Sequence, residues 1–92
     1  MTEPKFHLKV ASREGTVYEG NVSSISSFNK KGKFDVLASH ANFISLINKG
    51  LVIREADEKG PQKEFSFDNA LIRVVANNVE VYIGLESSPP SQ

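Results

Sequence analysis

Apolar and polar residues alternate in short runs along most of the chain. In the first run Phe6, Leu8 and Val10 alternate with His7 and Lys9, and this period of two predicts a β-strand with one buried face. Turn-forming residues separate it from later β-prone runs. The runs fall at residues 6–10, 16–20, 22–28, 34–37, 43–48, 51–55, 64–67, 71–75 and 79–83. The pattern predicts an all-β sandwich or barrel of about eight to ten short strands, with no long helix.

Residues 32–50 combine the most apolar segment with the clearest punctuation. The run Phe43–Ile47, with the sequence FISLI, predicts a strand that places Phe43 and some of its aliphatic residues in the core. The segment Asn48–Gly50 predicts a turn after it, and Gly20-Asn21 predicts an earlier turn. The serine-rich run 22–28 is weakly amphipathic, so we expect it to pair at a sheet edge or to face a second protein.

The totals describe one small domain with an ordinary composition. The chain has 92 residues and no cysteine, which excludes disulfides and thiolate metal ligands. Eleven basic residues balance eleven acidic ones, so the total charge does not favour nucleic acid, and no apolar run is long enough to span a membrane. We expect a disordered lead at 1–4, a domain at 5–85 and a disordered tail rich in serine and proline at 86–92.

The residues that could carry chemistry do not form a recognisable catalytic or metal site. His7 and His40 have no second ligand at the spacing of a metal pair, so no metal site is expected. Asp35, Ser39 and His40 supply the residue types of a hydrolase triad but lack the strained turn of a nucleophile elbow. The glycines form no phosphate-binding loop, and no cofactor is predicted. The residues favour a protein that is not an enzyme, and a small hydrolase is the last-ranked alternative.

A cluster of lysines and two tyrosines bear on a binding function. Lys30, Lys31 and Lys33 form a basic cluster, which by default is a solvated loop tip. A free-standing β-sandwich that binds peptide or carbohydrate is the alternative reading, and such modules present exposed aromatic residues. Without tryptophan, the chain offers only Tyr18 and Tyr82 for that purpose.

The stretch from Gly32 to Gly50 resembles the epsilon subunit of F-type ATP synthases. The shared positions are Gly32, Phe34, Val36, Leu37, His40, Ala41, Ile44 and Gly50, and the order and spacing of the other strands agree over about residues 5–85. The chain departs from the family at Ala38-Ser39 and Asn42, where the family has Pro-Gly and proline, and at Asn69-Ala70, where glycines are common. The family's two C-terminal helices are absent from this sequence, and we expect a natural short form.

The resemblance implies a flattened β-sandwich in the central stalk of the rotor, peripheral to the energy-coupling membrane and attached to it only through the complex. It implies a non-catalytic subunit that joins the gamma subunit to the polar loops of the c-ring and supports the coupling of proton flow to ATP synthesis. It gives no nucleotide site. It places five residues near the ring: Asn29, Lys30, Lys31, Gly32 and Lys33. It places six nearer gamma: Ser39, His40, Ala41, Asn42, Asp68 and Asn69.

Overall fold

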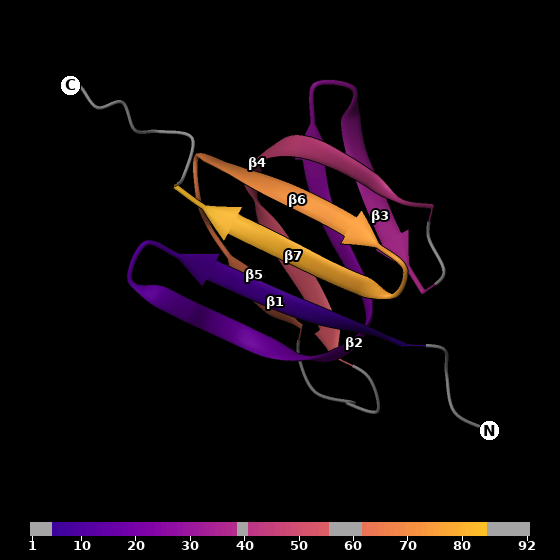
Figure 1. Ribbon diagram of the computed structural model, residues 1–92. Helices are drawn as coiled ribbons and strands as arrows, with labels where there is room; N and C mark the ends of the chain where they lie inside the picture. Colours follow the sequence, from indigo (N-terminus) through magenta and orange to yellow (C-terminus); the bar gives the residue numbers. More distant parts are fainter. Residues whose placement is uncertain (1–4, 39–40, 56–61, 85–92) are drawn as a thin grey trace.

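Two long strands, β2 and β4, organise the fold (Figure 1). The computed structural model describes residues 5–38, 41–55 and 62–84, and within them the chain forms seven strands and no helix. In chain order the strands are β1 (Phe6–Ser12), β2 (Gly15–Asn29), β3 (Gly32–Leu37), β4 (Phe43–Glu55), β5 (Lys63–Phe65), β6 (Asn69–Val75) and β7 (Asn78–Ile83). The all-β prediction is therefore confirmed.

The sheet is closed, because β2 and β4 pair with each other as well as with their other neighbours. The strand order is β3-β2-β1-β7-β6-β4-β5, with the additional pairing of β2 with β4. Every pair is antiparallel except β1 with β7. The closed part, β2-β1-β7-β6-β4, leaves fewer free strand edges than an open sheet of the same strands would.

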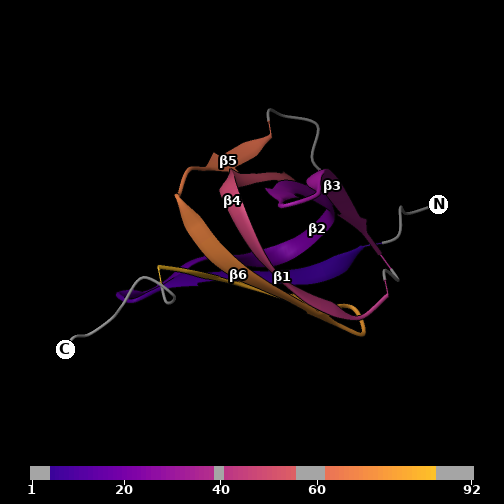
Figure 2. The same ribbon diagram turned by 90° about the horizontal axis from the view of Figure 1, so that it is seen from above.

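Each long strand contributes to two layers. The first half of β2 pairs with β1, and its second half pairs with β3 and β4. The first half of β4 pairs with β6, and its second half pairs with β2 and β5. The first layer therefore holds β1, β6, β7 and the first halves of both long strands, and the second layer holds β3, β5 and their second halves. Figure 2 shows β4 passing from one layer to the other.

The core lies between the layers and is mostly aliphatic. From β1, Phe6, Leu8 and Val10 are 3%, 0% and 0% exposed, as their alternation predicted. The rings of Phe34 and Phe43 meet edge to face, with centroids 5.9 Å apart, and pack against the core. The other buried apolar residues are Val22, Ile25, Val36, Ile47, Leu51, Ile53, Ala70, Ile72, Val74, Val79 and Val81.

Two segments predicted as turns lie inside strands, which is why the strands are fewer and longer than expected. β2 continues through Gly20, where the missing side chain leaves room for the ring of Tyr18. In β4 the segment Asn48–Gly50 forms a bulge, because Phe28 lies opposite Asn48 while Ser26 lies opposite Val52. Through this bulge β4 leaves β6 and joins β2, so the segment is a corner between the layers.

The serine-rich half of β2 lies within the second layer, not at its edge. β3 and β4 pair on its two sides, which corrects the prediction of edge pairing. Ser24 and Ser26 are 7% exposed and Ser27 is 1% exposed. Each hydroxyl has a partner: Ser27 Oγ donates to Gly50 O at 2.7 Å, Ser26 Oγ donates to Asp35 Oδ1, and Ser24 Oγ accepts from Arg54 Nη1 at 3.2 Å. These contacts satisfy polar groups that burial would otherwise destabilise.

Candidate functional site

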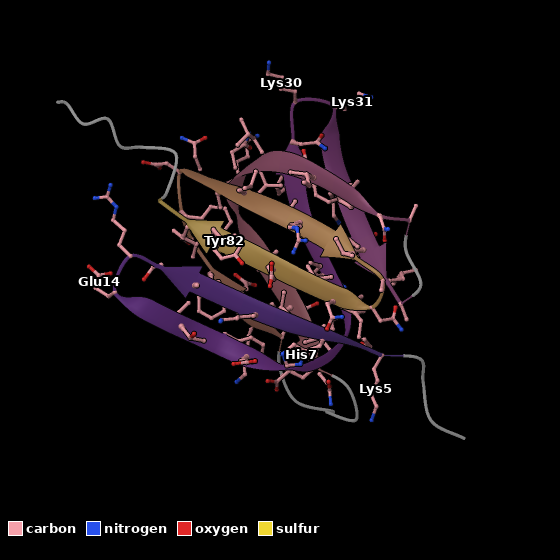
Figure 3. The ribbon with its side chains drawn as sticks, viewed as in Figure 1. Lys5, His7, Glu14, Lys30, Lys31 and Tyr82 are labelled. Carbon is pink, nitrogen blue, oxygen red and sulfur yellow. The ribbon has the colours of Figure 1, made fainter. Side chains whose placement is uncertain are left out.

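The five residues that the resemblance places near the c-ring form the tip of the β2–β3 hairpin, called here the hairpin tip. Asn29 and Gly32 lie opposite each other, and Lys30 and Lys31 connect the strands. The backbone N–H of Lys31 donates to Asn29 Oδ1 at 2.9 Å, and Gly32 takes a φ of 120°. Asn29 and Gly32 thus define a tight turn that holds both lysines out in solvent, as Figure 3 shows.

The lysines of the hairpin tip have no carboxylate partner among residues 5–38, 41–55 and 62–84. Arg73 of the first layer differs from these lysines, since its Nη1 lies 3.0 Å from Glu80 Oε1. The structure adds a cation that the sequence did not assign to this end. Lys49 Nζ lies 5.2 Å from the centre of the Phe28 ring, beside the base of the hairpin. Sequence reasoning missed Lys49 because it treated the residue as part of a turn.

The residues predicted to face gamma are not all gathered at one place. Ser39 and His40 lie outside the described residues. Ala41 and Asn42 precede β4, and Asn42 Oδ1 accepts a hydrogen bond from the N–H of Ala76 at 2.9 Å, in the turn between β6 and β7. Asp68 and Asn69 lie at the other end of the β4–β6 pair, where Asn69 is opposite Asn48. About 20 Å of strand separates the two groups, at 3.3–3.4 Å per residue.

A row of apolar side chains occupies the outer surface between those two groups. In β4, Ile44 and Leu46 are 63% and 58% exposed, and Leu46 lies opposite Leu71. Leu71 in turn lies opposite Tyr82, and both are partly exposed. We call these four residues the apolar row. The prediction that the FISLI run lies partly in the core holds for Ile47, which is fully buried, but Ile44 and Leu46 point outward.

A shallow groove of about 410 Å³ connects the hairpin tip with the apolar row. It lies where β2 and β4 separate, beyond the pairing of Phe28 with Asn48. The hairpin side supplies Asn29, Lys30 and Lys31, and the β4 side supplies Phe43 to Leu46. Cationic and apolar groups therefore form one continuous surface at this end of the molecule.

The outer surface of the first layer also holds a titrating pair, Glu80 and Tyr82. The Tyr82 hydroxyl hydrogen-bonds the Glu80 carboxylate and, together with the nearby Arg73, holds the pKa of Glu80 below its usual value. The same bond raises the pKa of Tyr82, because the carboxylate opposes the loss of the phenolic proton. The interaction adds stability above the unfolded pKa of Glu80 and loses it as the pH falls through the lower folded pKa.

We therefore expect Glu80→Gln to lose less stability on acidification than the natural chain, over the range below about pH 4.3. Urea unfolding at pH 7 and pH 3 measures the difference between the two free energies. Glu64→Gln is the control, since Glu64 lies exposed on β5. If Glu80→Gln and Glu64→Gln change the acid sensitivity equally, the contribution assigned to the Tyr82 bond is wrong.

Neither tyrosine forms part of an aromatic binding platform. Tyr18 lies opposite Val10 and Tyr82 opposite the next residue, Ala11, so the two rings project from opposite faces of the first layer. Tyr18 donates to Glu55 Oε2 at 2.7 Å and packs edge to face on Phe65. This arrangement gives no support to a carbohydrate-binding module.

The groups that a hydrolase or a metal enzyme would need are likewise not assembled in the described parts of the chain. Asp35 accepts a hydrogen bond from Ser26, while the two other triad residues lie outside the described ranges. The described residues hold no group of three or more histidines, cysteines or carboxylates placed to bind a metal. They also include no helix with the length and hydropathy that crossing a membrane requires.

A family model described as ATP synthase, Delta/Epsilon chain, beta-sandwich domain matches residues 5–84. The chain belongs to this family. The match covers all seven strands, including both long strands, so the delta/epsilon family accounts for the whole described fold.

Curated relatives carry the name ATP synthase epsilon chain. The relative from Endomicrobium trichonymphae is 35% identical over 77 residues, which are 84% of this chain and 54% of that protein. The relative from Clostridium novyi is 31% identical over 81 residues, which are 85% of this chain and 57% of that protein. The chain thus spans a little over half the length of these relatives.

Solved structures show the same fold at low sequence identity. A chain of the mitochondrial ATP synthase of Euglena gracilis superposes with a TM-score of 0.78 at 16% identity, over 97% of this chain and 59% of that one. A chain in the central stalk and c-ring of the Tetrahymena thermophila mitochondrial ATP synthase superposes with a TM-score of 0.71 at 17% identity, over 90% of this chain and 66% of that one.

Proposed function

We propose that the chain is a non-catalytic subunit of the central stalk of a proton-translocating F-type ATP synthase, where it joins gamma to the c-ring. Three findings support the proposal: the delta/epsilon family match, the relatives named ATP synthase epsilon chain, and the fold shared with central-stalk chains. The main structural support is the exposed hairpin tip, whose lysines have no acidic partner in the described part of the chain.

The hairpin tip is proposed as the contact with the polar loops of the c-ring. Lys30 and Lys31 project from the end of a tight hairpin, so they reach a neighbouring surface before the rest of the domain does. Lys33 and Lys49 stand behind them and add to the positive potential. Charge complementarity of this kind fixes orientation and partner choice more than it raises affinity. The ring loops that match this tip would carry carboxylates.

The apolar row is proposed as the centre of the contact with gamma, together with the predicted residues at its two ends. Ala41 and Asn42 border one end of the β4–β6 pair, and Asp68 and Asn69 border the other. A partner that reaches both ends must cover Ile44, Leu46 and Leu71 between them. An apolar centre with a polar rim is the usual composition of a lasting interface.

These contacts would place the subunit at the surface of the energy-coupling membrane, attached through the complex. Catalysis would belong to other subunits. Isolation of the chain under native conditions with an affinity tag tests this assignment. We expect gamma and the c-ring to co-purify with it, identified by mass spectrometry. A chain recovered alone from cells that contain the assembled synthase would overturn the proposal.

Reversal of charge at the hairpin tip is expected to weaken attachment to the ring without unfolding the domain. The double variant Lys30→Glu with Lys31→Glu replaces two exposed lysines, so the fold should lose less than about 0.5 kcal/mol per substitution. We expect a several-fold loss of c-ring from the purified complex and lower proton-coupled ATP synthesis in membranes. Co-purification of gamma should remain, because its proposed contact lies on β4 and β6.

The matched control is a pair of single variants. Arg13→Glu is compared with Lys30→Glu, which reverses one charge at the hairpin tip. Arg13 is an exposed cation in the turn between β1 and β2, far from the hairpin tip, and its reversal changes the total charge by the same amount. Ring attachment and ATP synthesis at natural levels in the double variant would contradict the role of the tip. An equal loss in the Arg13→Glu chain would show that only total charge matters.

A further inference from the structure

The outer surface of the second layer holds a separate groove of about 290 Å³. Its walls include Lys33 from β3, Lys49 and Arg54 from β4, and Glu64 from β5, and apolar atoms of Phe28 and Val52 lie between them. This groove does not include the apolar row, and none of the proposed gamma-facing residues lines it. Lys33 and Lys49 also add to the positive potential behind the hairpin tip, but Arg54 and the residues between β2, β4 and β5 take no part in the proposed stalk contacts.

The strand register places these cations at the two ends of the groove. Phe28 lies opposite Lys33 on β3, and the ammonium of Lys49 is held over the Phe28 ring from the other side. At the far end, Arg54 lies opposite Ser24 and donates to its hydroxyl at 3.2 Å. One N–H of the guanidinium is used in this way, out of the five that arginine carries. Along β2 these ends correspond to Phe28 and Ser24, which are about 13 Å apart at 3.3–3.4 Å per residue.

The carboxylates of this surface lie between the two cationic ends. Asp35 accepts from Ser26, and Ser26 lies opposite Val52, which in turn lies opposite Glu64. No described carboxylate pairs with Lys33, Lys49 or Arg54 within salt-bridge distance. A single phosphate or carboxylate cannot reach both ends. A uniformly acidic chain would meet Asp35 and Glu64 in the middle.

We propose that this groove binds an extended acidic segment of a partner protein, with two acidic residues separated by a neutral one on the side facing the groove. In an extended segment, residues i, i+2 and i+4 face the same way, and i and i+4 are about 13 Å apart. One acidic side chain meets Lys33 and Lys49, an apolar side chain lies over Val52, and the second acidic side chain meets Arg54. The proposal does not depend on membership of an ATP synthase, because its test uses the chain alone.

The test uses the capped pentapeptide Asp-Thr-Val-Thr-Asp, added to the isotope-labelled 92-residue chain and followed by NMR at low ionic strength. We expect saturable shifts confined to the second half of β2, the second half of β4 and β5, which weaken as salt is added. The matched peptide Asn-Thr-Val-Thr-Asn should bind at least about fivefold more weakly, as should the variant Lys33→Glu with Lys49→Glu towards the acidic peptide. Arg13→Glu should bind the acidic peptide almost as the natural chain does.

Two further probes decide between an extended segment and other anions. Inorganic phosphate at the same concentration should leave most of these amides unmoved, and vesicles containing phosphatidylglycerol should not bind the chain through Lys33 and Lys49. The proposal is wrong if phosphate reproduces the whole pattern of shifts, or if vesicle binding is lost in the double variant. Absence of saturable shifts with the acidic peptide would also overturn it.

Discussion

Replacing Gly50 with alanine is expected to destabilise the domain by about 3 kcal/mol, from backbone strain and overpacking together. Gly50 has a φ of 105° and is buried in the corner of β4. A Cβ on it would lie 2.5 Å from the carbonyl oxygen of Phe65, which is backbone and cannot rotate away. Ser27 Oγ donates to the Gly50 carbonyl at 2.7 Å, so any shift of the corner also disturbs a buried hydrogen bond.

Gly32→Ala separates the two causes. Gly32 has a φ of 120°, but no heavy atom lies within 4 Å of the position of its Cβ. We expect it to show the strain alone, about 1–2 kcal/mol. Urea unfolding of both variants gives the free energies, and thermal unfolding serves if Gly50→Ala accumulates poorly. Equal costs at the two glycines would show that the contact with Phe65 contributes nothing.

Replacing Leu46 with aspartate is expected to reduce the affinity for gamma by at least about thirtyfold, the effect of a central interface residue. Leu46 is 58% exposed in the middle of the apolar row, so the substitution should leave the core unchanged. In a complex, the new carboxylate would be buried among Ile44, Leu71 and the partner's apolar surface without a counter-charge. Titration of purified gamma with the chain measures the affinity directly.

Leu37→Asp is the matched control for this prediction. Leu37 is also 58% exposed, but it belongs to β3 in the second layer. The Leu37→Asp chain should bind gamma with close to the affinity of the natural chain. If both variants bind equally well, the apolar row is not the contact; if both lose binding equally, the effect of Leu46→Asp is not local.

The local part of the fold could be read from the sequence, because alternation within one strand reports its own two faces. Phe6, Leu8 and Val10 were assigned to the core on this basis, and all three are buried. The FISLI run gave no such answer, since apolar residues occupy both of its faces. Ile47 points inward and Ile44 outward because the second layer covers only one face of the first, and no single strand contains that information.

The corner at Asn48–Gly50 shows a second limit. Asparagine, lysine and glycine in succession are typical of a turn, and the local conformation is indeed left-handed at Lys49 and Gly50. Whether such a segment reverses the chain or only bends it depends on what the strand meets next. Here β2 accepts the second half of β4 and the strand continues, a long-range choice that also sets Lys49 over Phe28.

The candidate site was predicted unevenly for the same reason. The hairpin tip follows from local turn chemistry, and Asn29 and Gly32 form the turn that their residue types favour. The proposed surface for gamma depends on how β4 and β6 pair. The sequence named residues near its two ends but not the apolar row between them. Asn42, which stands where the family has proline, contacts Ala76 in a turn that is 34 residues away in the chain.

The sharing of β2 and β4 between the layers has a mechanical consequence. In a sandwich joined only by loops, one sheet can slide over the other by repacking side chains. Here two continuous strands cross from sheet to sheet, and they also pair with each other. Shear between the layers would have to stretch peptide backbone and break strand pairing at the same time. A domain built in this way resists shear as a single stiff body, and forces applied to one layer reach the other through the covalent chain.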